Sequence, residues 1–190
     1  VTRSNDGRAD PQGGFWIGTM GLNAEPGAGS IWRFHRGELR RLFPDITITN
    51  AICFSPGGEL AHFADTDRST IWQVRLDRDG WPAGDPQVFI DLNAEGLNPD
   101  GAVIDAQGGL WSAQWGAGRV ARYDRQGRFD RAIDLPAPHV SCPAFGGADL
   151  ATLFATTARQ GLDDPRDTDG CTYAVPAGVT GQQEHRVILG

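Results

Sequence analysis

The 190-residue sequence predicts an all-β protein, and three observations carry this prediction. Apolar stretches are short and rich in β-branched and aromatic residues, and helical periodicity is almost absent. Glycine and proline, with 26 and 12 residues, recur between these stretches and indicate frequent tight turns. The same order of motifs returns at intervals of roughly 40–50 residues, which is typical of β-propeller blades with about four strands each.

Each unit of the repeat has a polar motif, a glycine-rich turn and strands that run outward. In the first unit the turn at 13–14 precedes predicted strands at 15–19 and 30–34. The second unit has its turn at 57–58 and a strand at 70–74, and the third has its turn at 108–109 and strands at 110–113 and 119–123. The fourth unit is looser, with a turn at 146–147 and strands at 152–155 and 171–173. We therefore expect a partial β-propeller domain over residues 1–190.

The repeat also predicts where polar side chains gather. Asn5, Asn50 and Asp100 occupy corresponding places, at or before the inner strand of three successive units. The innermost strands of a propeller line a central channel. Rotation from blade to blade should therefore bring these three side chains together at one mouth of that channel.

About four blades fit in this sequence, whereas a closed propeller usually has more. An open arrangement leaves strand edges unpaired, which proteins generally avoid. We therefore expect the parent protein to have additional N-terminal blades, so that this chain holds roughly the C-terminal four.

Taken one by one, the polar motifs allow two interpretations each. Asp100 lies in a Pro-Asp-Gly sequence that suits a turn, but a channel-facing carboxylate could hold a hard cation and accept a proton. Asn50 could end a strand through its own backbone or supply an amide oxygen to a divalent cation. Arg3 and Asn5 could be solvated, or they could bind sugar hydroxyls and a developing carboxylate.

Composition excludes several classes of protein. The net charge is −7 and the arginines are scattered, so we expect no nucleic-acid partner. No apolar run reaches 18 residues, so we expect no membrane span, and without a visible signal peptide we expect a cytoplasmic protein. Three widely spaced cysteines argue against a disulfide framework and favour buried thiols. The four histidines lack metal-site spacing, and no GxSxG nucleophile motif is present.

An ordered series of motifs then resembles one known family. The series comprises Arg3–Gly7 with Asp10-Pro11, Gly18-Thr19-Met20, Thr49-Asn50-Ala51 with Phe54-Ser55-Pro56, Phe63–Thr66, Pro99-Asp100-Gly101 with Ile104-Asp105, Gly118–Val120, Cys142–Gly147 and Thr156–Arg159. Each motif alone is weak, but together they span nearly the whole chain. The sequence resembles the regucalcin (senescence-marker protein), gluconolactonase and luciferin-regenerating-enzyme family, and it looks most like bacterial members that act on aldonolactones.

The resemblance implies a six-bladed propeller with one divalent metal ion at the channel mouth, which could be calcium, zinc, manganese, magnesium or iron. It implies Asn50 and Asp100 as metal ligands, Asp100 as acid/base residue, and Arg3 and Asn5 as substrate contacts. The family's third protein ligand is a Glu in a motif that precedes the region covered here. Glu25 and Glu38 stand in the wrong motif contexts to replace it.

The function implied by the resemblance is metal-dependent hydrolysis of sugar (aldono-) lactones, such as gluconolactone or arabinonolactone, to the aldonic acid. The alternative is a non-catalytic calcium- or metabolite-binding propeller of the regucalcin type. A third possibility is an inactive fragment of an active enzyme. The Arg3/Asn5 pair favours the lactonase, because a pure metal buffer would not need it.

Overall fold

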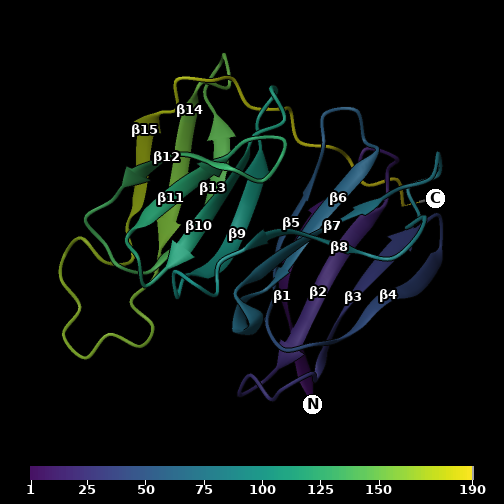
Figure 1. Cartoon of the computed structure of the whole chain (residues 1–190), viewed down its shortest axis with the longest axis horizontal. Coiled ribbons are helices and arrows are strands. Elements are labelled where there is room, and N and C mark those ends of the chain that lie inside the picture. The colour runs from purple at the N-terminus through teal and green to yellow at the C-terminus, as the bar shows by residue number, and fades with distance from the viewer. Residues whose placement is uncertain (190) are drawn as a thin grey trace.

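The computed structural model describes residues 1–189 and confirms the all-β prediction (Figure 1). Its strands form four antiparallel sheets in chain order, which is a four-blade propeller arrangement. Blade 1 contains β1 (Thr2–Ala9), β2 (Phe15–Gly21), β3 (Gly29–His35) and β4 (Glu38–Ile46); blade 2 contains β5 (Thr49–Phe54), β6 (Leu60–Asp65), β7 (Thr70–Arg75) and β8 (Gln87–Asp91). Blade 3 contains β9 (Asn98–Ile104), β10 (Leu110–Trp115), β11 (Arg119–Tyr123) and β12 (Phe129–Asp134), and blade 4 contains β13 (Val140–Gly146), β14 (Thr152–Thr157) and β15 (Thr172–Pro176).

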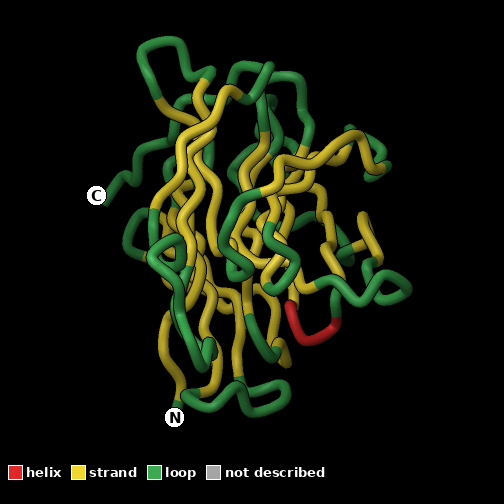
Figure 2. Tube along the Cα trace, turned by 90° about the vertical axis from the view of Figure 1, so that its left-hand side faces the viewer, coloured by secondary structure: helices red, strands yellow, loops and turns green. Residues whose placement is uncertain are grey.

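Helical structure within residues 1–189 is confined to one 3-10 turn, η1 (Thr66–Arg68), drawn red in Figure 2. No helix in this range is long and apolar enough to cross a membrane. Within each blade, consecutive strands pair with one another, so the first strand of each blade forms one edge of its sheet. The edge strand β5 contacts both β1 and β9, and β9 also contacts β13, so these four inner strands are neighbours.

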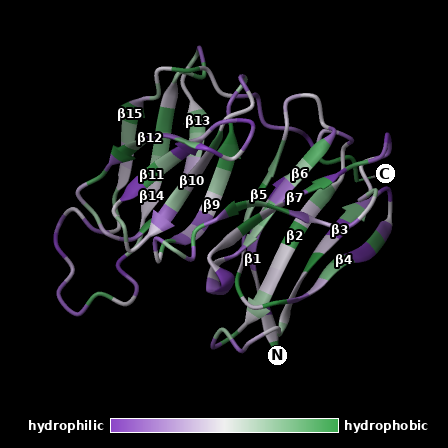
Figure 3. Ribbon diagram, viewed as in Figure 1, coloured by the Kyte–Doolittle hydropathy of each residue, from purple (hydrophilic) through white to green (hydrophobic). Residues whose placement is uncertain are grey.

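The core consists of three apolar clusters, each between two successive blades, and hydrophobic residues accordingly gather on the strands in Figure 3. Strand β5 contributes residues to two of these clusters. Ile52 and Phe54 pack in the cluster shared with blade 1, whereas Ala51 and Cys53 pack in the cluster shared with blade 3. Residues 51–54 are therefore buried on both sides of the strand, which explains their continuous apolar run instead of alternation.

Each inner strand contains a β-bulge or register shift, which lies near the middle of β1, β5 and β9 and near the start of β13. Asn5-Asp6 of β1 lie opposite one residue of β2, and Ala51-Ile52 of β5 lie opposite one residue of β6. Asp100-Gly101 of β9 lie opposite one residue of β10, and the register of β13 shifts at Ser141. A bulge bends its strand and redirects side chains, and it is frequent beside functional sites.

The Asp100-Gly101 pair therefore belongs to a strand and does not form the turn that its local sequence suggests. Glycine is needed at 101 because the next inner strand approaches closely. A Cβ atom there would lie 2.7 Å from the Cys142 Sγ and 2.8 Å from the Ser141 carbonyl oxygen. The Pro-Asp-Gly motif thus reflects contact between blades 3 and 4.

The segment that follows β15 returns across the blades to blade 1, as the yellow trace in Figure 1 shows. The Gly181 N–H donates to the Leu150 carbonyl, and the Ile188 N–H donates to the Gly13 carbonyl over 2.8 Å. We call residues 177–189 the C-terminal tail. It connects the last blade described here to the first.

The prediction for the cysteines is only partly correct. All three are free thiols, as expected, but Cys53 is buried, Cys142 is half-buried and Cys171 is exposed. Cys171 lies at the end of the long loop that precedes β15, and its side chain is exposed to solvent.

Candidate functional site

The three polar residues predicted to converge lie on three adjacent inner strands. Asn5 is on β1, Asn50 on β5 and Asp100 on β9. Their places are not fully equivalent, however. Asn5 and Asp100 are each the first bulged residue of their strand, whereas Asn50 directly precedes its bulge. Sequence spacing alone could not reveal this offset of one residue.

Asn5 and Asn50 contact each other directly. The Asn5 Nδ2 donates to the Asn50 Oδ1 over 3.3 Å and to the Thr49 carbonyl over 2.8 Å. The Asn5 Oδ1 accepts a hydrogen bond from Arg3 Nη1 at 3.0 Å. Arg3 is exposed and Asn50 is buried, so the three side chains form a polar chain from solvent into the protein.

Thr66, in η1, orients the other end of Asn50. The Asn50 Nδ2 donates to Thr66 Oγ1 at 2.8 Å, and that hydroxyl donates to the Pro99 carbonyl at 2.6 Å. Because the Thr66 proton is used on Pro99, its oxygen must accept from the amide nitrogen. The Asn50 Oδ1 is thereby directed toward Asn5, and Asn50 is linked to the residue before Asp100.

Thr66 was not among the residues selected from the sequence. Its only signal there is its place in the Phe63–Thr66 motif, and a threonine at a strand end is common. Its role becomes visible only when η1 is placed beside the inner strand β9, a contact between segments 33 residues apart.

Asp100 is half-buried, and its pKa is raised to about 7. Burial is the main cause, and the carboxylate of Asp6 adds to it, while a hydrogen bond from the Gly101 N–H opposes the shift. A carboxyl group with this pKa can exchange a proton near neutral pH.

Asp6 is a second residue that the sequence did not single out. It follows Asn5 in the same bulge, and burial raises its pKa as well. Its Oδ2 accepts the Ile52 N–H and its Oδ1 accepts the Gly7 N–H, both at 2.8 Å. Asp6 therefore links β1 to β5 next to the Asn5–Asn50 contact.

Glu25 and Glu38 lie apart from this cluster, as their motif contexts indicate. Glu25 is exposed after β2 and accepts hydrogen bonds from the backbone and side chain of Asn23. Glu38 begins the outermost strand of blade 1 and pairs with Arg40 at 2.7 Å. Neither supplies a carboxylate to Asn50 and Asp100.

The donor atoms suit a hard cation in kind but not in number. An amide oxygen from Asn50 and a carboxylate from Asp100 are ligands that calcium and similar ions prefer. Within residues 1–189, however, no group of three or more His, Cys, Asp or Glu side chains is arranged to hold a metal. Asn50 and Asp100 therefore offer two oxygen donors of the kind that a hard cation prefers.

Comparison with known proteins identifies the family of this chain. Residues 1–159 match the model of the SMP-30/Gluconolactonase/LRE-like region. A protein of Rhizobium meliloti (strain 1021), provisionally named a sugar lactone lactonase, is 45% identical over 85% of this chain and 55% of its own length. The 6-deoxy-6-sulfogluconolactonase of Pseudomonas putida is 35% identical over 96% of this chain and 65% of its own length.

Solved structures show the same fold. The calcium-binding protein regucalcin from Agrobacterium tumefaciens str. C58 matches with a TM-score of 0.95 and 43% identity, over 99% of this chain and 65% of that one. A luciferin-regenerating enzyme matches with a TM-score of 0.91 and 27% identity, over 99% of this chain and 66% of that one. This chain thus spans between about half and two thirds of the length of these proteins. The match over residues 1–159, with the shared propeller blades, shows that the chain belongs to the SMP-30/gluconolactonase/LRE-like family.

Proposed function

We propose that the protein containing this chain hydrolyses sugar lactones to aldonic acids. The observation that carries the proposal is the Arg3–Asn5–Asn50 chain of hydrogen bonds, which runs from solvent toward the blade that holds Asp100. It offers guanidinium and amide groups for a polyhydroxylated substrate beside a carboxyl group with a pKa of about 7. The names of the relatives from Rhizobium meliloti and Pseudomonas putida support the same substrate class.

In this proposal Arg3 and Asn5 bind the sugar hydroxyls and fix the lactone ring relative to Asp100. Asp100 accepts a proton from the attacking water and returns one to the ring oxygen as it leaves.

Asn50 and Asp100 are also the residues that would hold a divalent cation. The shift in the pKa of Asp100 supports this role, because a buried carboxylate near the carboxylate of Asp6 is stabilised by a positive charge. When bound, such a cation supplies Lewis-acid polarisation of the lactone carbonyl. The remaining ligand is predicted outside this chain.

The second candidate function is calcium binding without catalysis. The solved neighbour from Agrobacterium tumefaciens, described as a calcium-binding protein, favours it. Arg3 argues against it, because its guanidinium is exposed and bonded to Asn5, so it can bind a substrate but cannot ligate a cation.

An indicator assay for acid release tests the proposal. It uses the full-length natural protein, a panel of calcium, magnesium, manganese and zinc salts, and several lactones including gluconolactone and arabinonolactone. We expect metal-dependent acid release on at least one lactone. Metal binding by calorimetry without acid release on any of them would establish the non-catalytic alternative.

The variant Asp100→Asn tests the proton-transfer role. We expect kcat to fall by roughly 100-fold or more, because general acid-base catalysis contributes about 10²–10⁴-fold. Arg3→Met is the matched variant, and it should raise KM more than it lowers kcat. Full activity of Asp100→Asn would exclude Asp100 as the acid/base residue.

A further inference from the structure

Arg8 of blade 1 binds to blades 2 and 3 close to the candidate site. It lies on β1, three residues after Asn5. Its Nε donates to the Ile52 carbonyl at 2.9 Å, and its Nη2 donates to the Ala102 carbonyl at 3.0 Å. One guanidinium group therefore holds backbone atoms of both β5 and β9.

The two carbonyls belong to residues close to the site. Ile52 follows Asn50 by two positions, and Ala102 follows Asp100 by two positions. Because β5 and β9 are edge strands of separate sheets, no ladder of backbone hydrogen bonds fixes one relative to the other. The fork of Arg8 supplies that connection directly.

Asp6 strengthens the hold on β5. It accepts the Ile52 N–H, while Arg8 binds the Ile52 carbonyl. The two side chains from β1 thus form hydrogen bonds with both backbone polar groups of Ile52. A shift of β5 relative to β1 would have to break both bonds.

The C-terminal tail also contacts Arg8 and the two strands that Arg8 binds. Glu184 forms an ion pair with Arg8, whose side chain is only 15% exposed. Gln182 binds the same two strands further from the site. Its Nε2 donates to the carbonyls of Phe54 and Ile104 at 3.2 and 2.9 Å, each two residues beyond a carbonyl that Arg8 binds. The tail therefore bridges the same two strands as Arg8 without reaching the site.

We propose that Arg8 is a positioning residue that sets the spacing between the strands carrying Asn50 and Asp100, and that its pairing with Glu184 couples the C-terminal tail to the site. Arg8 acts through the backbone of β5 and β9. Its importance for catalysis rests on the proposed lactonase function, whereas its effect on the geometry of Asn5 and Asn50 does not.

The experiment compares Arg8→Met with Gln182→Ala in the full-length natural protein. Both variants remove a pair of bonds to β5 and β9 carbonyls, but only the first removes the pair beside the site. With ¹⁵N-asparagine labelling, we expect the side-chain amide signals of Asn5 and Asn50 to shift in Arg8→Met and to stay in place in Gln182→Ala. The exposed Asn23 and Asn93 serve as internal references.

Kinetics give the second readout. A misplacement of about 1 Å can cost roughly 100-fold in rate, so Arg8→Met should lower kcat by about 10–100-fold and change KM much less. Arg8→Lys keeps the charge for Glu184 but cannot fork to two carbonyls, so it should resemble Arg8→Met. Glu184→Gln should have a smaller effect of the same kind.

Unshifted Asn5 and Asn50 signals in Arg8→Met would overturn the proposal, as would a loss of kcat no greater than that of Gln182→Ala. If Arg8→Met does not fold, the same comparison is made with Arg8→Lys. If the wild-type protein opens no lactone, the proposed function fails, but the amide signals still decide the role of Arg8.

Discussion

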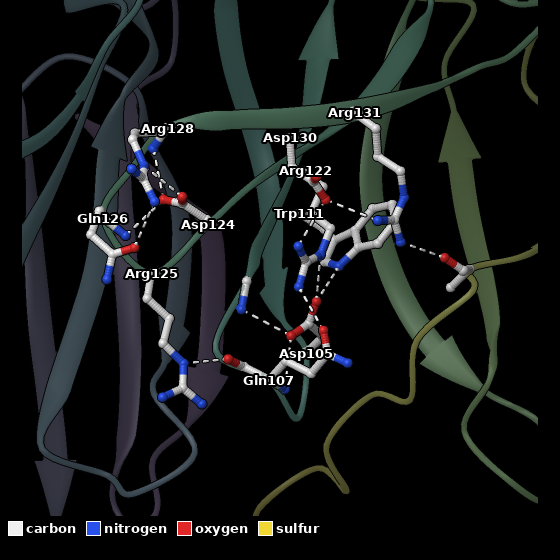
Figure 4. Close-up of polar contacts among 12 residues, drawn as sticks. Asp105, Gln107, Trp111, Arg122, Asp124, Arg125, Gln126, Arg128, Asp130 and Arg131 are labelled. Atoms are coloured by element: carbon white, nitrogen blue, oxygen red, sulfur yellow. Dashed lines mark hydrogen bonds and ion pairs between the residues drawn. The ribbon is translucent and has the colours of Figure 1, made fainter.

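Blades 1 and 3 contain the same set of a buried aspartate, a tryptophan and an arginine. The arginine and tryptophan have more hydrogen-bond partners in blade 3 than in blade 1. In blade 3, Asp105 Oδ2 accepts from Trp111 Nε1 at 2.9 Å and from Arg122 Nε at 2.8 Å (Figure 4). Asp130 provides a second carboxylate, which accepts from Arg122 Nη1 at 2.8 Å. The buried charge of Arg122 is thus shared between two partners.

Blade 1 places Asp10, Trp16 and Arg33 at the corresponding positions of its turn and strands. The Arg33 Nε donates to Asp10 Oδ2 at 2.6 Å, and both side chains are fully buried. Neither Nη atom of Arg33 nor Trp16 Nε1 has a hydrogen-bond partner within residues 1–189. Instead, the ring of Trp81 lies 4.3 Å from the Arg33 guanidinium.

The comparison shows that this arrangement anchors the turn of a blade and is not part of the candidate site. Asp10 and Asp105 each accept two N–H groups of their own turn, at Gln12 and Gly14 or at Gln107 and Gly109. Blade 2 replaces the three residues with Ser55, His62 and Gln73, which are uncharged when His62 is neutral. The fold therefore tolerates the loss of the charges when they are replaced together.

The largest loss of stability is expected when the Asp10–Arg33 ion pair of blade 1 is broken. Asp10→Ala leaves Arg33 charged, fully buried and without another carboxylate, which should cost about 3–5 kcal/mol of unfolding free energy. Asp105→Ala should cost less, about 2–3 kcal/mol, because Arg122 keeps Asp130. Urea unfolding of both variants measures the difference, and an equal or greater loss for Asp105→Ala would contradict the ranking.

The second largest effect on stability is expected at His62, which occupies in blade 2 the position of the tryptophan in blades 1 and 3. Burial lowers the pKa of His62 to about 4, from an ordinary value of about 6.5. Between these values the unfolded chain binds a proton that the folded chain excludes, so stability falls as the pH is lowered from about 6.5 to 4. The loss should reach about 3 kcal/mol.

Urea unfolding between pH 7 and pH 4 measures this effect in wild type and in His62→Gln, which removes the titrating group. The variant should lose less stability than wild type over this range. His185→Gln, which changes a partly exposed histidine of the tail, is the control and should follow wild type. Parallel curves for wild type and His62→Gln would show that His62 does not carry the pH dependence.

The smallest effect is expected at Trp81. Its ring contacts the guanidinium groups of both Arg33 and Arg40, at 4.3 and 4.0 Å. Trp81→Ala should therefore destabilise the protein by about 1–2 kcal/mol, and Trp81→Phe, which keeps a ring, by less. Thermal unfolding of the pair provides the measurement. Equal losses in the two variants would mean that a ring at position 81 is not what stabilises the buried Arg33.

Most second and third strands of the blades could be predicted, because most of them are largely buried, whereas the inner strands could be located only through their polar motifs. The segment predicted at 119–123 coincides with β11, and that at 70–74 lacks only one residue of β7. The outer strands β4, β8 and β12 could not be predicted in this way. They are largely exposed, and β4 contains adjacent arginines and a proline, so neither alternation nor β propensity distinguishes them from loops.

The convergence of Asn5, Asn50 and Asp100 on neighbouring strands could be predicted from the repeat, because strand order determines which segments meet at the centre. The roles proposed for these residues stay predictions. The bulges, the Thr66 relay and the fork of Arg8 depend on the distance between blades, which the order of motifs does not encode. Further N-terminal blades likewise stay a prediction.

The placement of alternate β5 residues in two different clusters has a consequence for folding. Ile52 and Ala51 are covalent neighbours, yet each completes the core of a different interface. Unfolding blade 2 would therefore expose apolar surface on blades 1 and 3 at once, so that neither could keep its own packing. We expect residues 1–189 to lose their structure in a single cooperative transition, in which an inner strand transmits a local defect to both sides.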